Sequence, residues 1–253
     1  MILSPSLRSA FPDAAAVVAL SAGGRLQCRG PLTPMEWPLL SPLPSGVRAQ
    51  VLEAARPRRY ARSEVVFHEG DPGDTLHLVR AGRLAVRVST DAGDSATLRI
   101  LRPGDAFGEL ALVAPSGRHR RTATVTALEK AETLALPRPA FTALCERFPE
   151  VEHLMLTLMA ERVDQLSQRL LEALYVGVER RVFRRLVELV DIYADGTAVS
   201  VIPLTQDDLA GLAGATRPTV NQVLQRLAGQ GVVTLQRGSI VVNDIATLRR
   251  RAG

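Results

Sequence analysis

The chain has 253 residues, 46% of them hydrophobic, and a formal net charge of +5, so it is long enough for two domains with buried cores and basic enough for a polyanionic partner. It contains no run of about eighteen apolar residues, and few basic residues precede its apolar stretch at 14–22, so we expect neither a membrane span nor a signal peptide. Two cysteines, Cys28 and Cys145, are too few for a four-thiolate cluster or a disulfide framework, and they predict free thiols in a reducing cytoplasm.

The N-terminal half of the chain divides into an extension and a strand-rich region. Residues 1–36 are rich in Pro, Ser, Ala and Gly with weak periodicity, which predicts a partly disordered extension. A helical pattern follows over 37–56, and residues 58–136 then alternate short apolar runs with Gly- and Asp-containing turns. Short strands at regular spacing indicate a β-sandwich or barrel. The strands are predicted at 65–67, 75–79, 84–88, 97–101, 123–127 and 132–137.

A long amphipathic helix is predicted over 149–175, and a second helix over 178–193. Apolar side chains recur every three or four residues along the first helix and form one continuous stripe. The stripe could pack on the strand-rich region, but its length and lack of interruption favour a seam between two helices of a dimer. The stripe consists of Met155, Met159, Val163, Leu166, Leu170 and Leu174.

Residues 206–225 fit a helix-turn-helix. Ala210 occupies the fifth position, where a small side chain lets the two helices approach. Gly214 occupies the ninth position, in a turn that needs a positive φ. The pattern therefore predicts a DNA-binding motif. Its buried positions are Leu209, Ala213, Ala215, Val220 and Val223.

Both helices of this motif carry start signals. Thr205 and Asp208 have the spacing of a capping box with acidic residues in the first turn. Thr216 can cap the second helix, and Pro218 lies just inside its start. These signals place the helix boundaries where a helix-turn-helix needs them.

The second helix, from 217 to about 228, exposes residue types that read bases. In the major groove Arg reads guanine, and Asn or Gln reads adenine. Residues 232–235 and 239–242 predict a β-hairpin wing, whose tip carries Arg237 for a phosphate contact. An ordinary helical hairpin in a core would also contain Ala and Gly, but the caps, the polar face and the hairpin together favour DNA binding. The candidate DNA contacts are Thr205, Gln206, Thr216, Arg217, Pro218, Thr219, Asn221, Gln222, Gln225 and Arg237.

A second group of functional residues lies at 107–112 and 121–123. Gly108 would let backbone amides approach a phosphate. Arg121 would neutralise the phosphate with a fork of donors, and Glu109 could accept a hydrogen bond from a sugar hydroxyl. The group therefore has residue types suited to a phosphate and to a sugar hydroxyl.

These motifs and their order resemble the Crp/Fnr family of bacterial transcription regulators over about residues 37–245. The run 68–74 and the turn at 81–82 add to the resemblance. The implied fold class is α+β, with a jelly-roll type β-barrel that binds a cyclic nucleotide, a dimerisation helix and a winged helix-turn-helix. The implied domains are an N-terminal extension (1–36), the barrel (37–148), the dimerisation helix (149–177) and the DNA-binding domain (178–253).

The resemblance also assigns roles to residues of the ligand site. It implies that Arg121 and Thr122 bind the cyclic phosphate, and that Glu109 binds the ribose 2′-hydroxyl. Backbone amides would come from Gly108 with Leu110 or Ala111, and the base pocket would be lined by Val86 and Val125. The family contacts the base with adjacent Thr and Ser on the long helix, and here these positions are Leu166 and Ser167.

Three departures from the family pattern affect specificity. Leu166 cannot hydrogen-bond a base, which weakens the case for cyclic AMP in particular. The loop before Arg121 is about two residues longer than in the family's cyclic-AMP receptor, so Arg120 is a rival for the phosphate contact. The base-reading positions that this receptor fills with Arg, Glu and Arg are Arg217, Pro218 and Gln222 here, so a different operator preference is expected.

Two isolated side chains favour structural interpretations. His77 lies on a predicted strand and is interpreted as a core or surface histidine rather than a ligand of haem. Cys145 lies in a helical pattern beside Leu144 and Phe148, which favours an inert buried thiol over a redox switch. Neither a nucleophile–base pair nor a metal-ligand cluster emerges, so we expect no catalysis, no metal and no cofactor.

The sequence therefore predicts a cytoplasmic, homodimeric transcription regulator. Its expected partners are double-stranded DNA with a pseudo-palindromic site and RNA polymerase, and its expected ligand is cyclic AMP or another cyclic nucleotide. One alternative is a regulator of the same fold that binds DNA independently of a cyclic nucleotide or responds to another signal. A second is a regulatory subunit that controls an enzyme, which is disfavoured because the winged helix-turn-helix occupies the segment after the long helix.

Overall fold

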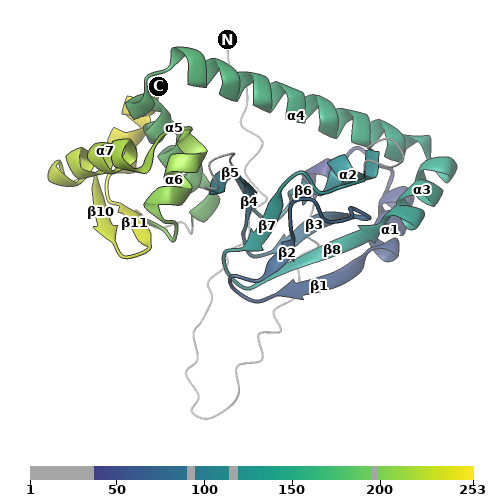
Figure 1. Ribbon diagram of the computed structural model, residues 1–253. Coiled ribbons are helices and arrows are strands. Elements are labelled where there is room, and N and C mark those ends of the chain that lie inside the picture. The colour runs from purple at the N-terminus through teal and green to yellow at the C-terminus, as the bar shows by residue number, and fades with distance from the viewer. Residues whose placement is uncertain (1–36, 90–94, 114–118, 195–198) are drawn as a thin grey trace, which may run out of the picture. The chain divides into compact units, whose positions relative to one another are not determined.

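The computed structural model describes residues 37–89, 95–113, 119–194 and 199–253 (Figure 1). The predicted extension, with Cys28, and the Gly/Asp turn at 91–94 lie outside the described residues. Among the described helices none is long and apolar enough to cross a membrane.

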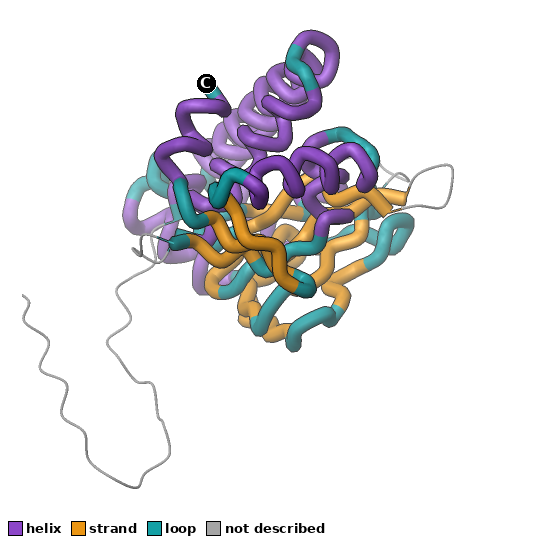
Figure 2. Tube along the Cα trace, turned by 90° about the vertical axis from the view of Figure 1, so that its left-hand side faces the viewer, coloured by secondary structure: helices purple, strands orange, loops and turns teal. Residues whose placement is uncertain are grey.

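Two four-stranded antiparallel sheets make up the strand-rich region, so the α+β, jelly-roll type fold is confirmed, although the two sheets do not close into one barrel. One sheet has the order β1-β8-β3-β6 and the other β2-β7-β4-β5, and Figure 2 distinguishes them in orange from the purple helices. The strands are β1 (Arg56–Tyr60), β2 (Val65–Phe67), β3 (Thr75–Ala81), β4 (Leu84–Ser89), β5 (Ser95–Leu101), β6 (Ala106–Phe107), β7 (Thr124–Ala127) and β8 (Ala131–Pro137).

Strands β1 and β6 were not predicted, and β1 shows why. Its sequence, Arg-Pro-Arg-Arg-Tyr, has no apolar alternation, and the first four of its residues are exposed. It is an edge strand, where Pro57 is tolerated because one side of the strand needs no ladder partner. Its pairing with β8, from Arg56 opposite Ala135 to Tyr60 opposite Ala131, fixes its conformation. Tertiary pairing therefore overrides a weak local signal.

Helices flank the sheets and continue into the C-terminal half. A buried cluster of Trp37, Leu40, Leu76 and other apolar residues joins the first sheet to the N-terminal helices. Helices α4 and α5 have the predicted bounds. The helical elements are η1 (Pro38–Leu40), α1 (Ser45–Ala54), α2 (Glu109–Val113), α3 (Arg138–Arg147), α4 (Pro149–Tyr175) and α5 (Val178–Tyr193).

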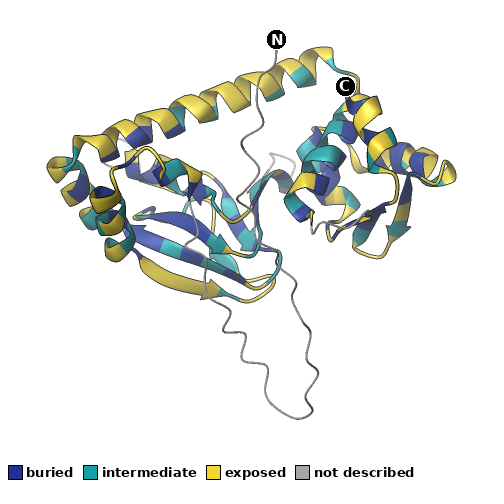
Figure 3. Cartoon of the chain, turned by 180° about the vertical axis from the view of Figure 1, so that it is seen from behind, coloured by how far each residue is buried: buried dark blue, intermediate teal, exposed yellow. Residues whose placement is uncertain are grey.

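The apolar stripe of α4 divides into two parts. Met155 is only 4% exposed and packs in the protein core, so the simple packing interpretation holds for the N-terminal part of the helix. From Val163 to Leu174 the stripe is 60–67% exposed, and Figure 3 shows this long helix mostly in the yellow of exposed residues. The second part is therefore an apolar surface without a partner inside the described protomer.

The C-terminal region is a winged helix-turn-helix. The predicted hairpin is present as β10 and β11, and β9 pairs with β11 as an unpredicted third strand. Leu209, Ala210, Ala213, Val220 and Val223 are all 5% exposed or less, as predicted, and Ala215 is partly buried against them. The elements are β9 (Ser200–Ile202), α6 (Gln206–Ala213), α7 (Arg217–Gly229), β10 (Val233–Gln236), β11 (Ser239–Val242) and α8 (Ile245–Ala252).

The two faces of strands β4 and β5 pack into two different hydrophobic cores. Leu84 and Leu101 are buried between the two sheets, whereas Ala85 and Ile100 belong to the core that contains α5, α6 and α7. Helix α6 lies directly on β5, because a Cβ atom added at Gly211 would be 2.5 Å from the Thr97 backbone nitrogen. Only glycine therefore fits at this contact.

Candidate ligand pocket and DNA-binding surface

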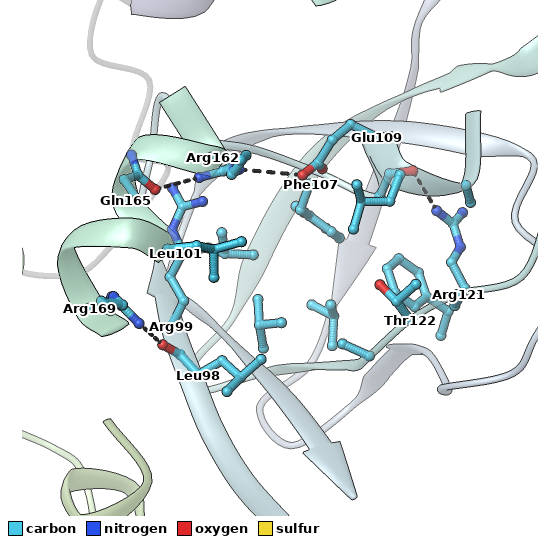
Figure 4. A pocket seen from close by; sticks show the side chains of 18 residues that line it. Leu98, Arg99, Leu101, Phe107, Glu109, Arg121, Thr122, Arg162, Gln165 and Arg169 are labelled. Carbon is cyan, nitrogen blue, oxygen red and sulfur yellow. Dashed lines mark hydrogen bonds and ion pairs between the residues drawn. The ribbon is translucent and has the colours of Figure 1, made fainter. Parts of the chain in front are cut away.

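A cavity of about 250 Å³ opens between the β2-β7-β4-β5 sheet, α2 and α4 (Figure 4). Its apolar wall includes Phe67, Leu98 and Leu101, and its polar groups come from β5, α2, α4 and the segment before β7. The structure brings together all but one of the predicted ligand contacts in this cavity. These are Val86, Gly108, Glu109, Leu110, Ala111, Arg121, Thr122, Val125 and Leu166.

Ser167 is the exception among the predicted ligand residues. It is exposed, does not line the cavity of its own chain, and donates its hydroxyl hydrogen to the Val163 carbonyl at 2.8 Å. Within one protomer its side chain is committed to its own helix, so a contact between Ser167 and a ligand stays a prediction.

Arg121 is a buried cation at the edge of the cavity. It is 5% exposed, and its guanidinium carbon lies 4.0 Å from the centroid of the Phe67 ring. Burial lowers the pKa of Arg121, yet arginine stays charged at neutral pH. None of the ion pairs among the described residues involves Arg121, and its Nε has no hydrogen-bond partner there. A buried charge without a counter-ion is costly, so this side chain is suited to an anionic ligand.

Burial distinguishes Arg121 from Arg120, the two candidate residues for the phosphate contact. Arg120 is exposed, donates a hydrogen bond of 2.7 Å to the Gly70 carbonyl, and does not line the cavity. Arg121 is buried and does line it. The position predicted from the Arg-Thr-Ala pattern is therefore the one that the fold places at the site.

Gly108 allows α2 to begin beside Arg121. Its φ of +83° lies in the left-handed region, which favours glycine. A Cβ atom there would lie 2.5 Å from Arg121 Nη1 and 3.0 Å from the Thr75 carbonyl oxygen. Any side chain would therefore displace the guanidinium or the backbone.

Arg162 is a pocket residue that the sequence interpretation missed. Its Nε lies 3.3 Å from Glu109 Oε1, and its Nη2 donates to the Ala106 carbonyl at 3.0 Å. Burial raises the pKa of Glu109, while Arg99 and Arg121 act in the opposite direction. Arg162 precedes Leu166 by four residues, and residues four apart share a helix face, so this spacing could have predicted it.

The end of the cavity away from Arg121 contains two further arginines that were not predicted (Figure 4). Arg99 on β5 pairs with Asp105 at 3.1 Å. Arg169 on α4 donates to the Leu98 carbonyl and lies 3.6 Å from Glu188. Leu166, three residues before Arg169 on α4, supplies only an apolar contact. The end of the cavity that is expected to hold the base therefore carries arginine donors near Leu166.

The first helix of the DNA-binding motif has the predicted capping box. The Asp208 backbone nitrogen donates to Thr205 Oγ1 at 3.1 Å, and the Thr205 nitrogen donates to Asp208 Oδ2 at 3.1 Å. Gly214 follows the helix with φ +59° and ψ +48°, the predicted left-handed turn. The cap of the second helix differs from expectation, because the Thr216 hydroxyl bonds to the Thr219 hydroxyl and not to a backbone amide.

Most of the predicted base-reading side chains are exposed. Arg217, Pro218, Gln222 and Gln225 are exposed on α7, and Arg237 is exposed at the hairpin tip beside Gly238. The expectation of full exposure is wrong for two others, Thr219 and Asn221, which are half-buried. They lie about 100° to either side of Val220 on the helix, at the borders of the face that packs into the core.

Hydrogen bonds at Asp208 connect the helix-turn-helix to strands β4 and β5. Its Oδ1 accepts hydrogen bonds of 2.9 Å from Arg87 on β4 and from Thr97 on β5. Burial acts to raise the pKa of Asp208, but the hydrogen bonds from Thr205, Arg87 and Thr97 outweigh it and hold the pKa below its usual value.

We expect Asp208→Asn to lower the free energy of unfolding at pH 7 by about 2 kcal/mol, because an amide cannot accept all of these hydrogen bonds. Folding lowers this pKa, so the stabilisation is fully present above the unfolded-state pKa of about 3.9 and is lost progressively as the pH falls from there through the lower folded-state pKa. Denaturant titration followed by circular dichroism at pH 7 and pH 3 measures both effects. Asp207→Asn is the matched control, since Asp207 is exposed and only 3.4 Å from exposed Arg217. A difference from wild type that does not shrink at pH 3 would contradict this assignment.

Comparison with known proteins matches both regions. A family model described as a cyclic nucleotide-binding domain matches residues 57–148, and one described as a Crp-like helix-turn-helix domain matches residues 180–251. The chain is 30% identical over 212 residues to the CRP-like cAMP-activated global transcriptional regulator of Mycobacterium tuberculosis, covering 83% of this chain and 93% of that protein. It is 32% identical over 216 residues to the cyclic AMP receptor protein of Thermus thermophilus, covering 84% and 97%. The crystal structure of the Thermus thermophilus catabolite activator protein matches with a TM-score of 0.50 at 32% identity, over 85% of this chain and 98% of that one.

Proposed function

This chain belongs to the Crp/Fnr family of transcription regulators, and from that premise we propose that cyclic AMP, bound in the pocket at Arg121, modulates its affinity for a pseudo-palindromic DNA site. The family carries a cyclic nucleotide-binding domain and a DNA-binding helix-turn-helix, and its members typically act as dimers. The proposed active species is a cytoplasmic homodimer that contacts RNA polymerase at the bound DNA site.

The buried, unpaired guanidinium of Arg121 is the observation that carries the ligand proposal. Its charge calls for an anion, and the wall formed by Val86, Leu98 and Val125 suits the flat apolar faces of a base. Glu109 lies on the cavity wall with Arg162 as its partner and is available to accept a sugar hydroxyl. Both relatives named above are described as responding to or receiving cyclic AMP, which supports that nucleotide over others.

Two structural links connect the pocket to the DNA-binding surface. Arg162 and Leu166 line the pocket from α4, the helix that also carries the exposed apolar stripe. Strand β5 lines the pocket with Leu98 and touches α6 at Gly211 through Thr97. A ligand that binds one arrangement of these elements better than another must shift the population toward it.

Titration of the full-length protein with cyclic AMP tests the ligand proposal, with cyclic GMP as the comparison nucleotide. We expect saturable heat with cyclic AMP, and a change in DNA affinity when the nucleotide is added at fixed salt. Absence of binding by both nucleotides would contradict the ligand assignment. Equal DNA affinity with and without bound nucleotide would instead favour the alternative of a regulator that acts independently of cyclic nucleotides, for which Leu166 is the main support.

Arg217→Ala is expected to weaken binding to the preferred DNA site by about tenfold to a hundredfold and to relax the preference at one base pair, because loss of a bidentate base contact costs about 1–3 kcal/mol. The site is first obtained by selection from random duplexes, and affinities are then measured by fluorescence anisotropy. Arg237→Ala provides the comparison, since a lost phosphate contact weakens all sequences alike and lowers the salt slope by about one. An unchanged base preference in Arg217→Ala would contradict the base-reading role.

A further inference from the structure

A row of polar side chains, the half-buried Thr75 and the buried His77 and Thr133, adjoins Arg121, and the proposed ligand contacts do not use it. Arg121 Nη2 donates to Thr75 Oγ1 at 2.7 Å. Thr75 Oγ1 lies 3.1 Å from His77 Nε2, and His77 Nδ1 lies 3.1 Å from Thr133 Oγ1. His77 is 5% exposed and Thr133 is fully buried. The row therefore runs from the pocket edge into the first sheet, along β3 and across to β8.

The directions of the hydrogen bonds in this row can be assigned starting from Arg121. A guanidinium only donates hydrogen bonds, so Thr75 Oγ1 is an acceptor there. Among the described residues the Thr75 hydroxyl hydrogen has no acceptor other than His77 Nε2, so we assign it to Nε2, which is then the unprotonated ring nitrogen. His77 consequently carries its proton on Nδ1 and donates it to Thr133.

His77 serves in this row as an uncharged acceptor. Burial, together with the charges of Arg121 and Arg58, lowers the pKa of His77 to about 3. Its ring stacks on Phe107 with centroids 4.9 Å apart and planes inclined by 14°. A neutral ring avoids repulsion with the nearby guanidinium and keeps Nε2 free to accept.

Hydrogen bonds to Thr75 occupy one edge of the guanidinium and leave another edge without a hydrogen-bond partner among the described residues. Its carbonyl accepts from Arg121 Nη1 at 2.9 Å while its hydroxyl accepts from Nη2, and the Gly108 carbonyl takes the second Nη1 hydrogen at 3.1 Å. Three of the five donors are thus used. Within the described residues the remaining two, on Nε and Nη2, have no partner. These two share one edge of the group, the arrangement that binds a phosphate with two parallel hydrogen bonds.

We propose that Thr75 and His77 are positioning residues for the phosphate contact, which hold Arg121 with its Nε–Nη2 edge open to the phosphate of the nucleotide. This inference rests on the proposed ligand site. His77 acts through Thr75, because its Nε2 accepts the Thr75 hydroxyl hydrogen and so keeps a lone pair of Thr75 Oγ1 directed at Arg121. Neither residue lines the cavity.

The test compares cyclic AMP with adenosine, which lacks the phosphate, by calorimetric titration of full-length variants. Thr75→Val keeps the side-chain shape and removes the acceptor, and we expect cyclic AMP to bind about tenfold more weakly while adenosine binding is unchanged. Thr75→Ser restores the hydroxyl and should recover wild-type affinity. Thr126→Val, the same chemical change on β7 outside the cavity lining, is the matched control and should bind like wild type.

Each other outcome overturns the inference. Unchanged cyclic AMP affinity in Thr75→Val would overturn it while leaving the proposed function intact, and an equal loss for adenosine would show a merely structural role. No binding of cyclic AMP by the wild type would overturn both proposals. Independently of any ligand, ¹⁵N NMR of the His77 ring should show the proton on Nδ1. A proton on Nε2 would contradict the assigned donors and acceptors of the hydrogen bonds that join Thr75, His77 and Thr133.

Discussion

Replacing Arg121 with alanine should weaken cyclic AMP binding by at least about a hundredfold. The buried guanidinium offers two open donors to the phosphate, and each hydrogen bond to a charged group contributes about 1.5–3 kcal/mol, so their loss exceeds the 2.7 kcal/mol that corresponds to a hundredfold change. The measurement is calorimetric titration of the full-length protein. Circular dichroism accompanies it, because Arg121 also bonds to Thr75 and Gly108 inside the fold.

Arg120→Ala is the control for this experiment. The two residues are neighbours with the same charge, but Arg120 is exposed and points its Nη1 to the Gly70 carbonyl. We expect its removal to leave cyclic AMP affinity within about twofold of wild type, as is usual for an exposed surface charge. Similar losses in both variants would mean that net charge, and not the Arg121 contact, governs binding.

Replacing Leu170 with glutamate should convert the protein to a monomer and reduce its affinity for a palindromic DNA site by at least about a hundredfold. Leu170 is 60% exposed at the middle of the unpartnered stripe that runs from Val163 to Leu174. In a two-helix seam the substitution would bury two like charges opposite each other. A monomer binds one half-site and loses the gain from joining two binding events.

The oligomeric state is measured by analytical ultracentrifugation, and DNA affinity by anisotropy with one-half-site and two-half-site duplexes. Gln168→Glu adds the same charge about 200° around the helix from Leu170, where Gln168 is exposed and bonded to Asp164, and should remain dimeric. The seam assignment would be wrong if Leu170→Glu stayed dimeric or kept its preference for the two-half-site duplex.

Some features follow from the sequence because short-range interactions fix them. The bounds of α4 and α5, the capping box at Thr205 and the left-handed turn at Gly214 match the predictions. Helix periodicity, cap chemistry and glycine's freedom at positive φ all act within a few residues. The winged helix-turn-helix could be predicted for the same reason.

Other features could be predicted only because the order of motifs resembles a family. Val86, Glu109, Arg121 and Leu166 belong to four separate segments of the chain, and no local pattern brings them together. The resemblance placed them in one site, and the cavity does contain them. Ser167 does not line this cavity, since its hydroxyl bonds to its own helix backbone, and its contact with a ligand stays a prediction.

The sequence by itself determined helices α4 to α7, the turn at Gly214 and the residue types suited to DNA and phosphate, since these depend on neighbours along the chain. Only the tertiary structure decided that Arg121 is buried where Arg120 is exposed, that Arg162 faces Glu109, and that His77 lies in a row of polar contacts behind Arg121. Burial and side-chain pairing between distant segments depend on how sheets and helices pack, and no spacing along the chain encodes that packing locally.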